Sequence, residues 1–235
     1  MLKNALYLIP VTLGDIQPEL VLPSQVFSVI RDLDEFIVEN LRSARRFLRK
    51  AGYQKEFEEV KFHILNKHTA YGSAPSFVDM IKQGKPVGLL SEAGVPCVAD
   101  PGAEVVKYCH EASIPVVPLS GPSSIILALM ASGFNGQNFT FHGYLPIDNS
   151  ALKKQIKKLE DAVFQQEQTQ IFIETPYRNN RLLKSLISNC NPKIKLCVAS
   201  EITTEDETII TASIGDWKKM QSDFHKKPAV FLLYR

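Results

Sequence analysis

Short apolar runs alternate with amphipathic segments through the first half of the chain, and no other feature constrains the fold as strongly. This alternation is typical of parallel strands buried between two layers of helices. We therefore predict an α/β domain with a mainly parallel sheet. The expected strands are residues 6–11, 35–39, 60–65, 87–91 and 115–119, and the expected helices are residues 40–51, 75–83 and 103–113.

The second half of the chain has a different rhythm. Its last apolar runs, at 195–200, 207–213 and 229–234, leave little room for crossover helices, which predicts a mixed or antiparallel sheet. We place the domain boundary after Leu119, which gives α/β domains of residues 1–119 and 120–235. The other elements expected here are helices at 123–132, from Ala151 and at 176–188, and strands at 139–144 and 170–174.

Composition sets the limits on function. The 235 residues are 45% hydrophobic and 22% charged, so the chain can bury a sizeable core. A formal net charge of +2 creates no global field that would select a nucleic acid or a membrane. Any such preference must come from local patches.

Cysteine and histidine spacing argues against a disulfide framework and a metal site. The cysteines have no C-x-x-C spacing and no secretory signal precedes them, so we expect free thiols in a cytoplasmic protein. The apolar run at 6–11 is too short to span a membrane. The histidines form no H-E-x-x-H pattern, and we predict no metal site. These residues are Cys97, Cys109, Cys190 and Cys197, and His63, His68, His110, His142 and His225.

Two loops of small residues are the best candidates for a binding site. Residues 91–102, with the sequence SEAGVPCVADPG, follow a predicted strand and precede a helix, and residues 120–124, SGPSS, do the same. Ligands of open α/β sheets bind at the carboxyl ends of strands, and the free N–H groups of a helix start can hold a carboxylate. The two loops suit one amphiphilic small molecule. They also suit two ordinary turns, since neither matches G-x-G-x-x-G or the phosphate loop.

Five loop signatures along the chain resemble those of the tetrapyrrole-methylase superfamily of S-adenosylmethionine-dependent methyltransferases, which has the class III methyltransferase fold. The chain is most similar to the branch that methylates a cytidine ribose 2′-hydroxyl in 16S rRNA. The signatures are Ile9-Pro10 with Gly14, residues 91–96, Asp100-Pro101-Gly102, Gly121-Pro122 and residues 143–146, GYLP.

The resemblance implies a homodimeric two-domain enzyme that binds S-adenosylmethionine in a cleft between its domains, with rRNA or the small ribosomal subunit as partner. It also implies which positions contact the cofactor. These are Pro10, Ala93, Gly94, Val95, Pro96, Asp100, Ser123 and Ser124 in the first set, and Ile173, Glu174, Ala199, Ser200, Pro228 and Ala229 in the second.

The chain departs from the rRNA branch where substrate would be contacted. Glu39-Asn40-Leu41-Arg42 stands in place of Glu-Asp-Thr-Arg, and Ser200 and Thr204 replace two cations. Pro228-Ala229 is closer to the last strand of tetrapyrrole methylases. Three interpretations therefore stay open: an rRNA methyltransferase, a methyltransferase for a tetrapyrrole or another small molecule, and a non-catalytic RNA- or ribosome-binding protein.

Two basic helix faces and one carboxylate complete the candidates. Arg42, Arg45, Arg46 and Arg49 share one side of a predicted helix, which is either a phosphate-contacting stripe or a solvated surface. Lys153, Lys154, Lys157 and Lys158 are better explained as a solvated face. Glu39 with Arg42 is the catalytic candidate, and the alternative is a structural pair of the two.

Overall fold

The computed structural model describes residues 2–65 and 70–235, so His68 lies outside the described residues. The chain divides into two compact units, Met1–Ser123 and Ser124–Arg235, where the sequence placed the division after Leu119. The extra residues belong to the first unit because they are tied to its first strand. The Leu119 N–H donates to the Leu8 carbonyl at 3.1 Å, and Gly121 lies against Pro10.

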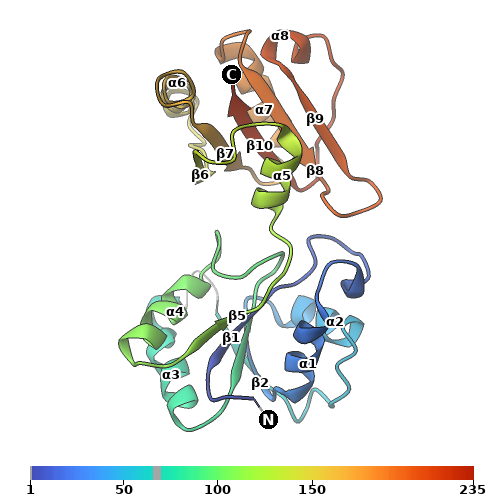
Figure 1. The fold of residues 1–235 in the computed structure, drawn as a ribbon, viewed down its shortest axis with the longest axis vertical. Helices are drawn as coiled ribbons and strands as arrows, with labels where there is room; N and C mark the ends of the chain where they lie inside the picture. The colour runs from blue at the N-terminus through green and yellow to red at the C-terminus, as the bar shows by residue number, and fades with distance from the viewer. Residues whose placement is uncertain (1, 66–69) are drawn as a thin grey trace. The chain divides into compact units, whose positions relative to one another are not determined.

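The first unit is built on a five-stranded parallel sheet, called sheet A here, in the order β3-β2-β4-β1-β5 (Figure 1). The prediction of a mainly parallel sheet is confirmed. The strands are β1 (Leu6–Ile9), β2 (Glu35–Val38), β3 (Lys61–Ile64), β4 (Val87–Leu90) and β5 (Val116–Pro118).

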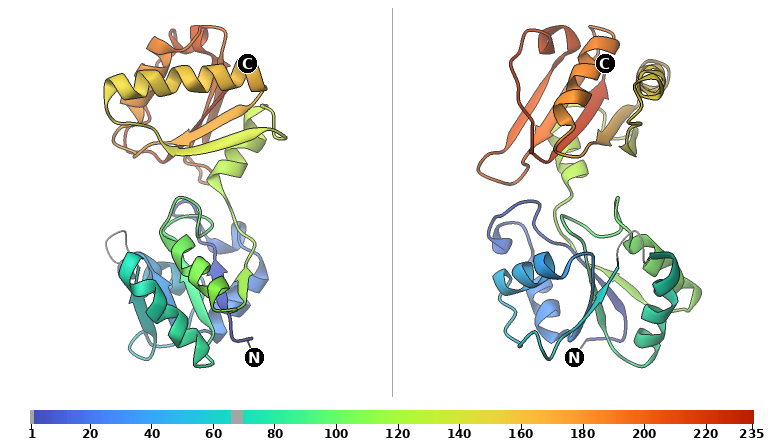
Figure 2. Two further views of the ribbon diagram at one scale, coloured as in Figure 1. Left: turned by 90° about the vertical axis from the view of Figure 1, so that its left-hand side faces the viewer. Right: turned by 180° about the vertical axis from the view of Figure 1, so that it is seen from behind.

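Helices cover both faces of sheet A. One face holds α1 (Ser24–Asp32) and α2 (Leu41–Lys50), and the other holds α3 (Ala70–Lys82) and α4 (Gly102–Glu111). Figure 2 shows the two layers from further sides. The sequence analysis missed α1 and the short 3-10 turn η1 (Pro18–Leu20) because prolines mark this stretch as loop. Pro23 instead lies at the start of α1, where a missing N–H costs nothing.

This arrangement creates a topological switch point beside β4. The chain leaves β4 toward α4 on one face, whereas it leaves the neighbouring strands β1 and β2 toward α1 and α2 on the other. In open α/β sheets, ligands bind outside the carboxyl ends of the strands at such a point.

The second unit contains a mixed sheet, called sheet B, in the order β6-β7-β10-β8-β9, and only its β6–β7 pair is parallel. The prediction of mixed pairing is confirmed. Its elements are α5 (Ser124–Ser132), β6 (Phe139–Tyr144), α6 (Asn149–Gln166), β7 (Thr169–Ile173), α7 (Asn179–Asn189), β8 (Lys195–Ser200), β9 (Thr208–Ser213), α8 (Ile214–Trp217) and β10 (Ala229–Tyr234).

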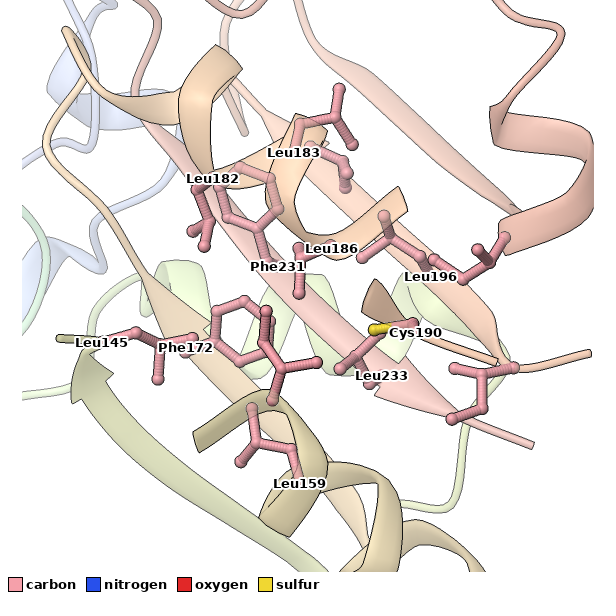
Figure 3. Packing of buried hydrophobic residues seen from close by; sticks show 14 of the residues in the cluster. Leu145, Leu159, Phe172, Leu182, Leu183, Leu186, Cys190, Leu196, Phe231 and Leu233 are labelled. Atoms are coloured by element: carbon pink, nitrogen blue, oxygen red, sulfur yellow. The ribbon is translucent and has the colours of Figure 1, made fainter. Parts of the chain in front are cut away.

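One continuous apolar core joins sheet B to α6, α7 and α8, and Figure 3 shows its centre. Phe172 and Phe231, from adjacent strands, stack with their ring centroids 6.0 Å apart. Leu159 of α6 and Leu186 of α7 pack into the same cluster. The helix α5 contacts β8, β9 and β10. The sequence analysis missed α8, a single turn whose buried Trp217 donates its indole N–H to the Leu196 carbonyl at 2.9 Å.

A buried carboxylate ties together the amino ends of three strands of sheet A. The side chain of Glu35 is only 6% exposed, and it contacts Lys85 at 3.0 Å, His63 at 3.4 Å and Lys61 at 3.9 Å. Burial alone would raise the pKa of Glu35. The hydrogen bond and charge of Lys85, with help from His63 and Lys61, outweigh it, so the pKa is lowered.

We expect Glu35→Gln to lower the free energy of unfolding by about 2 kcal/mol at neutral pH, because it removes a buried charge-assisted hydrogen bond. A lowered pKa means that the carboxylate stabilises the fold fully above its unfolded value of about 4.5 and loses this effect as the pH falls through the folded value. The difference between variant and wild type should therefore shrink in acid. Urea unfolding across pH measures it.

The matched control is Glu111→Gln, which removes an exposed pair with Lys107. Exposed pairs of this kind contribute at most about 1 kcal/mol. Equal losses in the two variants would contradict a special role for Glu35.

Candidate functional site

The loops at the carboxyl edge of sheet A are fastened to one another through the Gly94 carbonyl. This oxygen accepts a hydrogen bond from the Val11 N–H at 2.9 Å and another from the Ser91 hydroxyl at 2.9 Å. Val11 follows β1 and Ser91 follows β4, which are adjacent parallel strands. The two loops therefore form one rigid edge at the switch point.

Two glycines allow a third loop, after β5, to join this edge. A Cβ at Gly121 would lie 2.2 Å from the Pro10 Cβ, so only glycine permits the close approach of the two loops. Gly94 has a φ of 71°, and a Cβ there would lie 2.9 Å from Leu13 Cδ2 and 3.0 Å from the Pro122 carbonyl oxygen. The structure thus brings Pro10, Gly94 and the turn before Ser123 together.

Asp100 gives the loop after β4 its shape. Its carboxylate accepts the Cys97 N–H at 2.8 and 2.9 Å and the Gly102 N–H at 2.8 Å. Cys97 and Ala99 adopt left-handed φ angles of 69° and 64°, which these bonds hold in place. Burial raises the pKa of Asp100, and its two backbone partners oppose that shift. The carboxylate of Asp100, a predicted cofactor residue, therefore makes its hydrogen bonds within the loop itself.

A cleft of about 230 Å³ opens beside this edge, between the loop after β1, helix α2 and the start of the loop after β4. The Ser43 hydroxyl donates to the Glu92 carboxylate across it at 2.6 Å. The Lys50 ammonium lies 2.6 Å from Asp15, and its hydrogen bond and charge hold the pKa of Asp15 below its usual value. Arg46 also lines the cleft.

The predicted catalytic pair lies at the start of α2 but outside this cleft. Glu39 follows β2, is half-buried and borders a small hollow with Asp100 and Gly102. Arg42 is exposed in the first turn of α2. Asn40, one of the departures from the rRNA branch, caps α2, because its side chain accepts the Arg42 N–H at 2.9 Å and the Ser43 N–H at 3.3 Å.

Glu92 is a candidate that the sequence analysis did not select. It is exposed, lines the cleft and immediately precedes Ala93 and Gly94 of the predicted cofactor loop. A sequence signal was present, since Glu92 is the first charged side chain after the buried strand β4.

The predicted arginine stripe divides in two. The guanidinium of Arg45 lies over the rings of Phe57 and Phe62, at 5.3 and 5.4 Å, and that of Arg49 lies 4.1 Å from the Phe57 ring centroid. Arg49 also donates to the Tyr53 and Lys55 carbonyls at 2.9 Å each. Of the four arginines, only Arg46 lines the cleft. The four arginines therefore do not form one free stripe, because aromatic residues beyond the end of α2 contact two of them.

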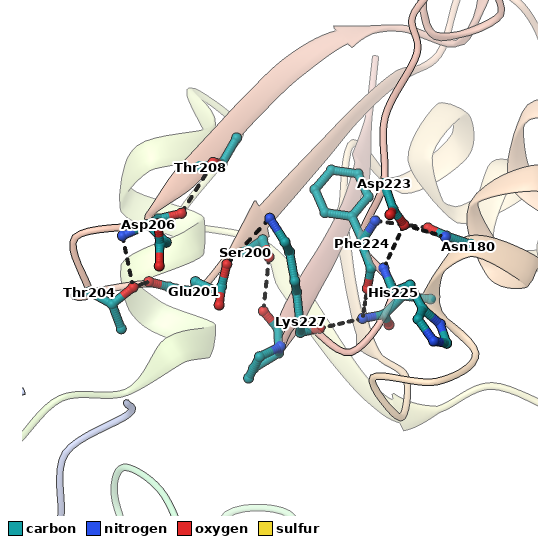
Figure 4. Close-up of polar contacts among 12 residues, drawn as sticks. Asn180, Ser200, Glu201, Thr204, Asp206, Thr208, Asp223, Phe224, His225 and Lys227 are labelled. Atoms are coloured by element: carbon teal, nitrogen blue, oxygen red, sulfur yellow. Dashed lines mark hydrogen bonds and ion pairs between the residues drawn. The ribbon is translucent and has the colours of Figure 1, made fainter. Parts of the chain in front are cut away.

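The structure gathers the second set of predicted cofactor residues at one end of sheet B. Ala199 and Ile173 both pair with Val230, and Ser200 pairs with Ala229. Ser200 is buried and its hydroxyl donates to the Pro228 carbonyl at 3.2 Å. Figure 4 shows this end, where Lys227 also pairs with Glu201 at 3.5 Å.

Glu174 lies just past the end of β7 in the same set, and its carboxylate accepts the Arg178 Nε–H at 3.0 Å. Ser124 is the first residue of α5 in the second unit, whereas Ser123 ends the first unit. Contact of either set with a cofactor stays a prediction.

The cysteines are free thiols, as predicted, and burial raises the pKa of Cys97 to about 12. Across residues 2–65 and 70–235, no group of three His, Cys, Asp or Glu side chains is placed to hold a metal ion. In the same residues no helix is long and apolar enough to cross a membrane.

A doubly wound parallel sheet with a rigid edge of small residues, followed by a unit with a mixed sheet, defines the class III methyltransferase architecture. The chain belongs to the family of Tetrapyrrole (Corrin/Porphyrin) Methylases, whose model matches residues 6–218.

Solved structures agree on this fold. The methyltransferase CobJ superposes with a TM-score of 0.67 at 17% identity, covering 98% of this chain and 94% of that one. Diphthine synthase gives 0.69 at 13% identity, covering 97% and 88%. Uroporphyrin-III C-methyl transferase from Thermus thermophilus, complexed with S-adenosylhomocysteine, gives 0.59 at 16% identity, covering 98% and 97%.

Among curated proteins, the chain is similar to enzymes named ribosomal RNA small subunit methyltransferase I. It is 30% identical to that of Bacillus subtilis (strain 168) over 211 residues, which cover 90% of this chain and 68% of the relative. It is 27% identical to that of Escherichia coli O157:H7 over 234 residues, covering 98% and 78%. The chain is an S-adenosylmethionine-dependent methyltransferase.

We expect Gly94→Ala to lower the affinity for S-adenosylhomocysteine at least about tenfold, or 1.4 kcal/mol. The added Cβ must displace Leu13 or the loop after β5, which distorts the edge of sheet A. Calorimetric titration measures the affinity.

The matched control is Gly52→Ala, because Gly52 also has a left-handed φ, of 79°, but has open space around its Cβ position. It should cost about 1–2 kcal/mol of stability through backbone strain alone and leave the affinity unchanged. Full affinity in Gly94→Ala would show that this edge does not hold the cofactor.

Proposed function

We propose that this protein transfers the methyl group of S-adenosylmethionine to a ribose 2′-hydroxyl of small-subunit ribosomal RNA. The observation that carries the proposal is the 30% identity, across 90% of the chain, to a ribosomal RNA small subunit methyltransferase I. The carboxylate-lined cleft beside the loop after β4 supports it, because transfer to a hydroxyl needs a group that can take a proton.

The donor would lie against the edge of sheet A formed by Pro10, Gly94 and the turn before Ser123. The loop after β4 suits a ligand with both apolar and polar parts, since its exposed side chains, Ala93, Val98 and Ala99, are small and apolar and leave the backbone accessible. S-adenosylmethionine supplies an electrophilic methyl group. The protein must then hold the acceptor oxygen in line with it at near-attack distance.

Glu92 would accept the proton of the acceptor hydroxyl. Glu92 immediately precedes Ala93 in the chain. The Ser43 hydroxyl donates to the Glu92 carboxylate and fixes its orientation. In the transfer, the ribose oxygen forms the new bond to the methyl carbon, the bond from that carbon to sulfur breaks, and the hydroxyl proton passes to Glu92. Arg46 and Lys50, in the same cleft, would attract the neighbouring phosphates.

Several further contacts and properties are predictions. Cofactor contacts by Ile173, Glu174, Ala199, Ser200, Pro228 and Ala229 belong to them, as do the homodimer and the cytoplasmic location. RNA contacts by Arg42, Arg45 and Arg49 are predictions too, although Arg45 and Arg49 already contact aromatic rings.

The test is tritium transfer from labelled S-adenosylmethionine to undermethylated small ribosomal subunits, with a precorrin-type tetrapyrrole assayed in parallel. We expect transfer to the rRNA alone. Glu92→Gln should lower the turnover number about 100-fold or more, the usual contribution of a positioned proton acceptor, and should leave the affinity for S-adenosylhomocysteine unchanged.

Two further variants sharpen the test. Glu58→Gln, on an exposed loop of the same unit, should retain wild-type turnover. Glu39→Gln decides between the two carboxylates: a greater loss of turnover there than in Glu92→Gln would return the catalytic role to Glu39. Transfer to the tetrapyrrole and not to rRNA would overturn the proposed function.

A further inference from the structure

We propose that the groove between α6 and α7 binds the phosphate backbone of the RNA substrate. The groove has a volume of about 630 Å³ and lies wholly within the second unit. It is distinct from the cleft that contains Glu92, and the inference rests on the proposed function. Its lining includes the cations Lys153, Arg181 and Lys184 and the polar side chains Ser185, Ser188 and Asn189.

Helix α7 presents one chemically uniform face to the groove. Arg181, Lys184, Ser185 and Ser188 follow a spacing of three, four and seven residues, which places them on one side of a helix. Arg181 and Lys184 are the only charged residues of α7. The face extends for about 10 Å along the helix axis. Cations, hydroxyls and amides are the side chains that contact phosphate and sugar in nucleic-acid complexes.

Among the residues that the structure describes, no carboxylate lines the groove. The acidic residues of α6 are engaged elsewhere. Glu160 is buried, accepts the Asn191 N–H and lies 3.9 Å from Lys157, and Asp161 pairs with Lys157 at 3.4 Å. The lysine face that the sequence analysis took as solvated therefore divides, with Lys153 in the groove and Lys157 in ion pairs.

The cations of the groove differ in how the fold holds them. The Arg181 guanidinium donates to the Ile147 carbonyl at 2.9 Å and to Asn149 Oδ1 at 2.7 Å, which fixes its plane and leaves further N–H donors. Within the described residues, no hydrogen bond or ion pair holds the ammonium group of Lys153 or Lys184, and both side chains are exposed.

The charge pattern favours RNA over a protein partner. The neighbouring hollow, which Lys184 also borders, is lined by Trp217, Met220 and Asp223, a mixed surface of the kind that proteins bind. The α6–α7 groove instead offers positive charge together with small polar groups, and Leu152 is its apolar member. A chain of phosphates matches this lining.

The experiment measures affinity for unmodified small-subunit rRNA at salt concentrations from about 50 to 200 mM. The variant Lys153→Gln/Lys184→Gln removes two cations whose ammonium groups make no hydrogen bond or ion pair in the described residues. The control, Lys154→Gln/Lys158→Gln, removes the same charge from exposed positions of α6 outside the groove.

We expect the groove variant to lose at least about tenfold in affinity and its log–log salt slope to flatten by about 1.4–1.8, or 0.7–0.9 for each lost phosphate contact. The control should change neither quantity by more than a small fraction of this. Equal effects in both variants would overturn the inference, because they would reflect net charge alone. Displacement of the RNA by polyglutamate as readily as by polyuridylate would assign the groove to an acidic protein instead.

Failure of this inference and failure of the proposed function are distinguishable. If the wild type and the groove variant methylate rRNA equally at the same low concentration of subunits, the proposed function stands and RNA binding by the groove is contradicted. If the wild type transfers no methyl group but the groove variant shows the expected loss of salt-dependent RNA affinity, the proposed function is contradicted and RNA binding by the groove is supported.

Discussion

The hydrogen bonds accepted by the Gly94 carbonyl are the constraint on which the first unit depends for its chemistry. They join the loops after β1 and β4, and the missing Cβ of Gly94 lets Leu13 and the loop after β5 close around the same point. The next two residues toward β4 are Ala93 and Glu92. The two hydrogen bonds therefore position both the loop proposed to hold the methyl donor and the carboxylate proposed to act on the acceptor. Precise placement is most of what a methyltransferase must supply, because the donor already carries a reactive methyl group.

In the second unit, Ser200 and Thr204 stand where the resemblance to the rRNA branch implies cations. Ser200 is buried and bonded to the Pro228 carbonyl, and the Thr204 hydroxyl donates to the Glu201 carbonyl at 2.8 Å. These positions now serve the fold. Uncompensated positive charge is found instead in the α6–α7 groove, which carries no loop signature and is visible only once the two helices are placed side by side.

The sequence predicted the parallel sheet of the first unit well because its strands are short, apolar and separated by helical segments of regular period. It failed at α1, where the prolines before the helix hid its start, and at α8, which is a single turn held by Trp217. At the site, the resemblance predicts that the loop after β4 contacts the cofactor, and the structure adds how Gly94 and Asp100 shape this loop. The division of the arginine stripe was beyond sequence reasoning, since Phe57 and Phe62 reach Arg45 only through the tertiary fold. The sequence could not place Glu92 beside Ser43, since these residues are 49 positions apart and meet only in the fold.

Hydrogen–deuterium exchange with and without S-adenosylhomocysteine tests the central claim most directly, which is that the fastened loops of sheet A hold the methyl donor. The account predicts slower exchange on binding at the amides of residues 11–14, 91–102 and 119–123, with Val11 among the most protected. The amino end of the same sheet, around Glu35, should be unchanged. Protection confined to residues outside these loops, at a ligand concentration that saturates the protein, would contradict the account.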